Sequence, residues 1–111
     1  MPITDEDCEA AIDWMKANAK RIGLLRGRMV AAEEGMRRVK SLEMIAIRQD
    51  GEKRTVAEIE SLAYASDAYR LALEELESAT ADYETEKIYL NAADLQVRAW
   101  QSMHSASRRG L

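Results

Sequence analysis

Proline occurs only once in the 111-residue sequence, at Pro2, so no later position carries the residue that most strongly interrupts a helix. Glycine, the next strongest helix breaker, occurs five times. An all-β fold needs many turns, and this chain has few of the residues that build them. Charged residues make up 32% of the chain and phenylalanine is absent, which suits long exposed helices better than a compact globule. The sequence therefore predicts an all-α fold.

Apolar residues recur every seven positions in two long stretches, a spacing typical of coiled-coil packing. One stretch lies before Gln49 and the other after Ser66, and smaller residues alternate with the large ones in both. The large members, which we call the packing seam, are Met15, Ile22, Met29, Met36, Tyr69, Leu76, Tyr83, Leu90 and Val97. The pattern predicts two long helices that pack along this seam.

Hydroxyl residues mark the predicted helix starts. Thr4 with Asp7, and Thr55 with Glu58, have the spacing of a capping box, and Ser66 fits an N-cap. The polar residues between the first two helices read as a loop. The signals predict a single helical domain, residues 1–111, with helices at about 5–48, 56–64 and 67–106.

Small residues stand four apart along the first predicted helix, at Ala19, Gly23, Gly27, Ala31 and Gly35. Each interior glycine lowers helix stability by about 1 kcal/mol relative to alanine. This small-residue stripe indicates close helix packing, a kink, or simple tolerance of glycine. The sequence leaves these three interpretations open.

Charge favours antiparallel pairing of the two long helices. Residues 16–48 carry a net charge of +6 and residues 55–97 carry −8, whereas the two chain ends reverse these signs. An antiparallel hairpin sets each block against its opposite. The predicted register places Met15 near Trp100, Ile22 near Ala93 and Met36 near Ala79.

A single two-helix seam is a thin core, because ordering each residue costs about 1–2 kcal/mol of backbone entropy. Further apolar residues lie beside the seam: Trp14, Leu24, Val30, Leu42, Ile45, Leu71, Leu73, Ile88, Tyr89 and Leu95. They predict a second buried face. We therefore expect a homodimer that forms a four-helix or elongated helical bundle.

Several classes of protein do not fit the sequence. The longest apolar run, Met44 to Ile47, is far shorter than the roughly 20 residues that cross a bilayer. The acidic N-terminus is unlike a secretory signal, and one cysteine, Cys8, cannot form an internal disulfide. These features predict a soluble, cytoplasmic protein without membrane contact.

Catalytic chemistry is not indicated either. The chain has one histidine and one cysteine, far apart in the sequence, and no Glu-x-x-His pair or glycine-rich phosphate loop. We therefore expect a non-enzymatic protein with no metal, no cofactor and no small-molecule ligand.

Basic residues along the first helix are candidate contacts for nucleic acid or a protein partner: Arg26, Arg28, Arg37, Arg38, Lys40 and Arg48. Ion pairing with the acidic third helix is the simpler use of these charges, and we favour it. The net charge of −4 and the pI of about 5.1 argue against strong autonomous DNA binding.

Two other features have alternative interpretations. Trp100 either caps the core near Met15 and Met103 or anchors a partner protein from an exposed position. An acidic face on the third helix either keeps the helix solvated or imitates a nucleic acid; its residues are Glu74, Glu75, Glu77, Asp82 and Glu84.

One family resemblance rests on packing motifs in the second half of the chain. The motifs are Ala57, Glu58, Glu60, Ala63-Tyr64-Ala65, Tyr69, Leu73-Glu74, Leu76, Ala79, Glu86, Leu90, Ala92-Ala93 and Trp100. They resemble a family of small, uncharacterised helical proteins of phages and prophages, often encoded in early or recombination regions. That family tends to have His-Pro where this chain has Ser66-Asp67, and both pairs suit a helix start. The resemblance implies a phage origin and a bacterial host cell.

The leading functional hypothesis is an accessory or adaptor for recombination or replication proteins, acting through its helical surfaces. A second hypothesis is nucleic-acid binding through the basic residues of the first helix. A third is a structural or host-inhibiting protein that does not contact DNA.

Overall fold

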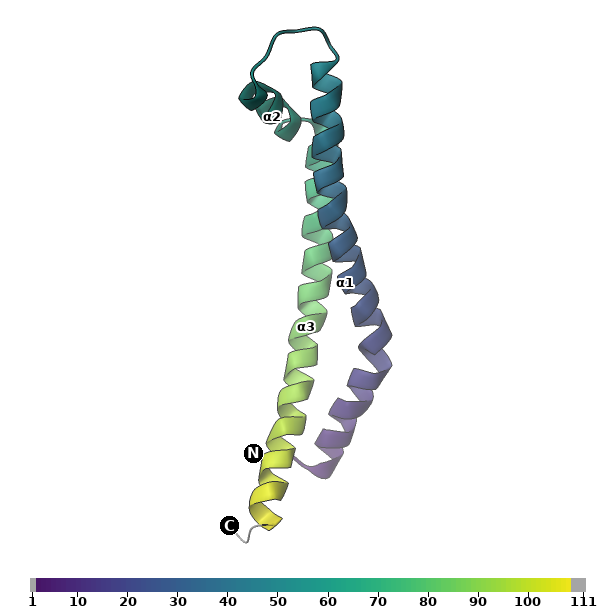
Figure 1. Cartoon of the computed structure of the whole chain (residues 1–111). Coiled ribbons are helices and arrows are strands. Elements are labelled where there is room, and N and C mark those ends of the chain that lie inside the picture. Colours follow the sequence, from purple (N-terminus) through teal and green to yellow (C-terminus); the bar gives the residue numbers. More distant parts are fainter. Residues whose placement is uncertain (1, 109–111) are drawn as a thin grey trace. The chain divides into compact units, whose positions relative to one another are not determined.

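The computed structural model describes residues 2–108, and Met1 and residues 109–111 lie outside the described part. Within residues 2–108 the chain has no strand and forms α1 at Asp5–Arg48, α2 at Val56–Tyr64 and α3 at Asp67–Arg108 (Figure 1). The predicted all-α fold with two long helices is confirmed. The third helix continues two residues beyond its predicted end at residue 106.

The start of α1 is a reciprocal capping box. The backbone N–H of Asp7 donates to Thr4 Oγ1 at 3.0 Å, and the backbone N–H of Thr4 donates to Asp7 Oδ2 at 3.0 Å. These two bonds satisfy donors that have no partner within the helix. The hydrogen bonds from Thr4 also hold the pKa of Asp7 below its ordinary value of 3.8.

Hydroxyl groups likewise cap α2 and α3. Thr55 Oγ1 accepts a hydrogen bond from the backbone N–H of Glu58 at 3.1 Å. Ser66 Oγ accepts from the backbone N–H of Tyr69 at 3.1 Å and donates to the carbonyl of Ala63 at 2.8 Å. Ser66 therefore begins α3 and also satisfies a terminal carbonyl of α2.

The glycines fall into two structural classes. A Cβ built at Gly23, Gly27 or Gly35 meets no atom within 4 Å, so close packing within the chain is not the reason for the small-residue stripe. Gly51 differs because its φ is +83°, in the left-handed region that favours glycine. It lies in the turn after α1, where Arg54 Nη1 donates to the carbonyl of Ile47 at 3.3 Å.

The two classes of glycine predict opposite effects of an alanine substitution on the free energy of unfolding. Gly23→Ala should raise the free energy of unfolding by about 1 kcal/mol, because Gly23 is an interior helix position with open space around it. Gly51→Ala should lower it by about 1 kcal/mol, because a Cβ disfavours a positive φ. Urea unfolding followed by circular dichroism measures both. A loss of stability in Gly23→Ala would show that this position is covered.

The chain divides into two compact units. The first unit contains the start of α1, to Leu24, and α3 from Tyr83 onward; the second contains residues Leu25–Asp82. The buried residues of the first unit are Cys8, Ala11, Ile22 and Ala93, and those of the second are Ile59, Ala63 and Ala79. Each unit thus has a very small core.

In the first unit, the two helical segments run antiparallel. Trp100 Nε1 donates to Asp5 Oδ1 at 2.8 Å, and Arg21 pairs with Glu86 at 2.5 Å. The predicted contact of Met15 with Trp100 is wrong, because Met15 lies ten residues after Asp5, about 15 Å along a helix.

The partner of Ala93 in the first unit differs from the prediction as well. Ala93 and Ala92 line one hollow with Ala11 and Trp14, rather than with Ile22. The observed pairing in this unit is therefore shifted by about three helical turns from the predicted register.

In the second unit the predicted register is also wrong, because α2 packs beside the last turns of α1. The short helix α2 folds back beside the last turns of α1, where Lys40 contacts Glu60 and Tyr64 (Figure 1). The third helix therefore starts beside an earlier turn of α1. Met36 consequently shares a hollow with Ala72, seven residues before the predicted Ala79.

Candidate functional site

Large apolar side chains remain exposed in both units. In the first unit they are Leu24, Ile88, Tyr89, Leu95 and Met103. In the second they are Val30, Leu42, Ile45, Val56, Leu62, Tyr64, Leu71 and Leu73. These exposed residues include nine of the ten apolar residues that the sequence places beside the packing seam. The tenth, Trp14, is half-buried, and its ring centroid lies 6.3 Å from that of Tyr89.

The packing seam itself is only partly covered. Ile22 is buried. The other seam residues are half-buried: Met15, Met29, Met36, Tyr69, Leu76, Tyr83, Leu90 and Val97. Methionine and tyrosine side chains that stay half-exposed along a seam leave apolar area available for a further contact.

An apolar groove of about 350 Å³ lies between α1 and α3 in the second unit. Most of the residues that line it are small or aliphatic, and two, Arg28 and Glu75, are charged. The full lining consists of Arg28, Ala31, Ala32, Gly35, Met36, Val39, Ala72 and Glu75. The alanines and the glycine make the groove, because larger residues at those positions would fill it. We call this feature the α1–α3 groove.

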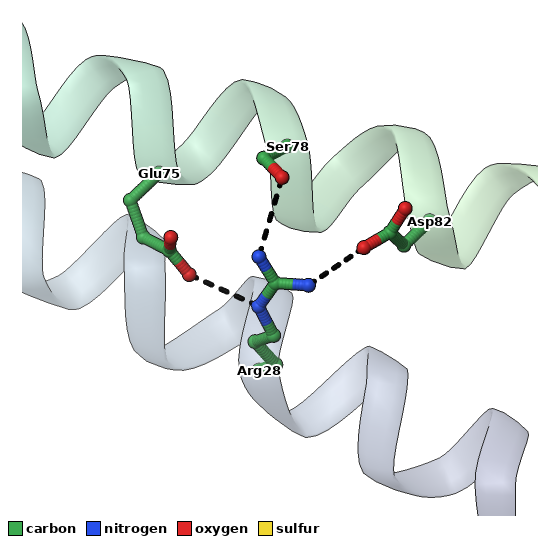
Figure 2. Close-up of polar contacts among 4 residues, drawn as sticks. All are labelled: Arg28, Glu75, Ser78 and Asp82. Carbon is green, nitrogen blue, oxygen red and sulfur yellow. Dashed lines mark hydrogen bonds and ion pairs between the residues drawn. The ribbon is translucent and has the colours of Figure 1, made fainter.

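One arginine at this groove bridges the two helices. Arg28 Nε donates to Glu75 Oε1 at 3.0 Å, Nη1 to Asp82 Oδ2 at 2.7 Å and Nη2 to Ser78 Oγ at 3.3 Å (Figure 2). Its three acceptors lie on successive turns of α3, so one planar guanidinium reaches all of them. The hydrogen bonds that Arg28 donates to Glu75 and Asp82 raise its pKa. This cluster fixes the local register of α1 against α3.

A second polar cluster holds α2 against α1. Lys40 Nζ donates to Tyr64 Oη at 2.7 Å and to Glu60 Oε1 at 3.0 Å, and it lies 4.5 Å from the centre of the Tyr64 ring. The Tyr64 hydrogen bond, followed by that of Glu60, raises the pKa of Lys40 above 10.5. In turn, Lys40 lowers the pKa of Glu60 below 4.5.

These shifts predict how the Lys40 cluster depends on pH. Its stabilisation should be complete between about pH 5 and 10, because both charged forms are favoured there. It should be lost as the pH falls through the lowered pKa of Glu60, and as it rises through the raised pKa of Lys40. The difference in unfolding free energy between the wild type and Lys40→Met should shrink at both extremes. A difference that does not change with pH would contradict this account.

The six candidate basic residues divide into two groups. Arg28 and Lys40 pair with acids on other helices, and Arg37 pairs with Glu34 on α1 at 2.7 Å. Within residues 2–108, the remaining three make no ion pair: Arg26, Arg38 and Arg48. Three of the six candidate basic residues are therefore neutralised by acids of the same chain.

The acidic face of α3 is also partly occupied. Glu75 and Asp82 bind Arg28, and Glu74 accepts from Arg70 at 2.9 Å. The spacing of Glu75 and Asp82, seven residues apart on one helical face, was the available sequence signal for a shared cation. The sequence predicted that the six basic residues as a group pair with acids of the third helix. It did not single out Glu75 and Asp82 as the partners of Arg28.

Trp100 belongs to a small polar cluster that the sequence did not suggest. Its indole donates to Asp5, and its ring stacks on His104 with 3.9 Å between centroids. His104 Nε2 lies 3.6 Å from the same carboxylate oxygen of Asp5. Trp100 is half-buried by these neighbours. It therefore fits neither the predicted contact with Met15 nor a fully exposed anchor.

In the described part of the chain, the remaining cysteine and acidic residues form no metal-binding cluster. Cys8 is a free thiol, buried at 4% exposure. Among residues 2–108, no group of three or more histidine, cysteine or acidic side chains is arranged to hold a metal ion. In the same part of the chain, no helix has a stretch apolar enough to span a bilayer.

Comparison with known proteins gives no relative: no family model matches the chain, and neither a curated protein nor a solved structure is similar to it. The candidate site is thus defined by its geometry alone. It consists of the α1–α3 groove, Arg28 with its three acceptors on α3, and the exposed apolar residues of the second unit.

Proposed function

We propose that this chain is a non-enzymatic helical interaction module that acts as a homodimer, with its long helices paired as an antiparallel hairpin. The observation that carries the proposal is the distribution of apolar side chains. Among residues 2–108, seven apolar residues are buried, all of them alanine, isoleucine or cysteine, whereas thirteen large apolar residues are exposed. Exposed apolar surface of this extent is typical of a protein that binds another protein.

The self-association is tested by sedimentation velocity at micromolar concentration. We expect a single species of about twice the chain mass of 12.5 kDa. A stable monomer across this range would overturn the dimer. The heat-capacity change of unfolding provides a second measurement, because burial of apolar surface at an interface increases it.

The cellular role in this proposal is that of a phage-derived adaptor for recombination or replication proteins in the cytoplasm of a bacterial host. This part rests on the family resemblance of the second half of the chain. Affinity purification from a lysate of a lysogenic host tests it, with an unrelated helical protein of the same charge as control. Selective enrichment of recombination or replication proteins is expected; their absence would leave a structural or host-inhibiting role as the better hypothesis.

Direct binding of nucleic acid is the second candidate function, and the unpaired Arg26, Arg38 and Arg48 favour it. A gel-retardation assay at low salt compares the wild type with the triple variant Arg26→Glu, Arg38→Glu, Arg48→Glu. Binding through α1 should weaken strongly in the variant and with rising salt. Weak binding that is the same in both proteins would exclude this function.

A further inference from the structure

The exposed side of α1 in the second unit carries a regular series of residues. Ala31, Gly35, Arg38, Leu42 and Ile45 are spaced alternately by four and three residues, so they share one face of the helix. Leu42 is 58% exposed and Ile45 is 49% exposed. Two of the five, Ala31 and Gly35, also line the α1–α3 groove. We call this series the outer face of α1.

We infer that the outer face of α1 packs against the same face of a second copy, with the two α1 helices antiparallel and crossing at Gly35. This inference rests on the proposed dimer and specifies its interface. A two-fold interface uses one surface twice, so it must be complementary to itself.

The charges around the crossing point have this self-complementarity. Glu33 and Glu34 precede Gly35, whereas Arg37 and Arg38 follow Met36. Arg38 lies on the outer face of α1 and Glu34 borders it, so antiparallel pairing about this point sets Glu34 of one copy against Arg38 of the other. A parallel pairing in register would instead set acid against acid and base against base.

Residues farther from the crossing point pair in the same way. The two-fold relation sets Arg28 of one copy beside Leu42 and Glu43 of the other. Arg28 is already held by acids of its own chain, so its charge is neutralised where an apolar side chain must dock. Leu42 of the second copy then lies at the Arg28 end of the α1–α3 groove.

Space for this contact exists at the crossing point itself. A Cβ placed on Gly35 meets no atom of its own chain within 4 Å. The glycine lets a second helix approach closely, and the open groove beside it accepts a side chain from that helix. The exposed apolar residues at positions 42 and 45 supply the burial that the chain alone lacks.

Charge-swap variants test the proposed pairing of Glu34 with Arg38 of the other copy. Glu34→Arg and Arg38→Glu should each weaken the homodimer about tenfold, because each change occurs twice in a two-fold interface. An equimolar mixture of the two variants should form heterodimers preferentially, with an affinity near that of the wild type. Native mass spectrometry of one labelled and one unlabelled variant measures this preference.

The mixture shows whether a variant weakens the dimer through charge repulsion across the interface or through charge repulsion within its own α1. Glu34 and Arg38 are also four residues apart, so each variant places like charges together within its own α1. That internal effect is unchanged by mixing. A statistical mixture of homodimers and heterodimers would therefore overturn the inference.

Disulfide trapping gives an independent test. In a Cys8→Ala background, Gly35→Cys should form a covalent dimer on mild oxidation, because the two copies of position 35 meet at the axis. Ser41→Cys is the matched control on the same helix. Its two copies would lie about 18 Å apart along the paired helices and should not cross-link.

The outcomes distinguish the interface from the dimer itself. A wild type that is monomeric at micromolar concentration overturns both. A wild-type dimer without trapping at position 35, and without heterodimer preference, overturns only the proposed α1 interface. Trapping at position 35 together with preferential heterodimers supports both.

Discussion

Replacing Ile22 by alanine should lower the free energy of unfolding by about 2–5 kcal/mol, the cost typical of truncating a buried isoleucine. Ile22 is 8% exposed and is the largest buried side chain of the first unit. The other buried residues there are Cys8 and two alanines. Such a small core offers few side chains that can move into the resulting cavity, so we expect a value in the upper part of this range.

Ile88→Ala is the matched control within the same unit. Ile88 is 67% exposed, so the same substitution should change the free energy of unfolding by no more than about 0.5 kcal/mol. Both substitutions give the helix an alanine, so their effects on helix propensity are alike. Urea unfolding followed by circular dichroism compares them. Equal losses in the two variants would mean that Ile88 is covered by a contact that the chain alone does not make.

Ala79→Leu should destabilise the second unit by about 1–3 kcal/mol through overpacking. Ala79 has no exposed surface and lies on the α3 face that packs toward α1. A leucine adds three carbon atoms where the surrounding side chains leave no space. The backbone or the neighbouring side chains must move to admit it.

Ala72→Leu provides the control, seven residues earlier on the same face of α3. Ala72 lines the α1–α3 groove, so an added side chain enters open space. We expect no loss of stability and a small gain from apolar contact with Met36 and Val39. If both leucine variants lost the same stability, the groove would not be open in solution. Calorimetric unfolding measures both changes.

Local sequence signals account well for the secondary structure. The scarcity of proline and glycine predicts helix, and this is what the chain forms. The hydroxyl groups of Thr4, Thr55 and Ser66 each accept a hydrogen bond at the start of a helix. These bonds connect residues three apart, so the sequence alone contains the information that they need.

The positions of the predicted site residues were harder to obtain. Charge blocks correctly indicated that α1 and α3 segments run in opposite directions within each unit. They did not indicate the register, because blocks of like charge tolerate a slip of several turns. The register depends on the place where α2 packs, and the pattern of a nine-residue helix is too short to show which turn of α1 it packs against.

The sequence by itself determined that this chain is helical and where its helices begin, because those features arise from interactions a few residues apart. Only the tertiary structure decided which turns of α1 and α3 meet, that Arg28 bridges Glu75 and Asp82, and that the glycines of α1 face open space. The physical reason is that heptad patterns repeat. Every seven-residue shift of one helix offers nearly the same apolar contacts, so specific polar pairs and the packing of α2 select one register among several.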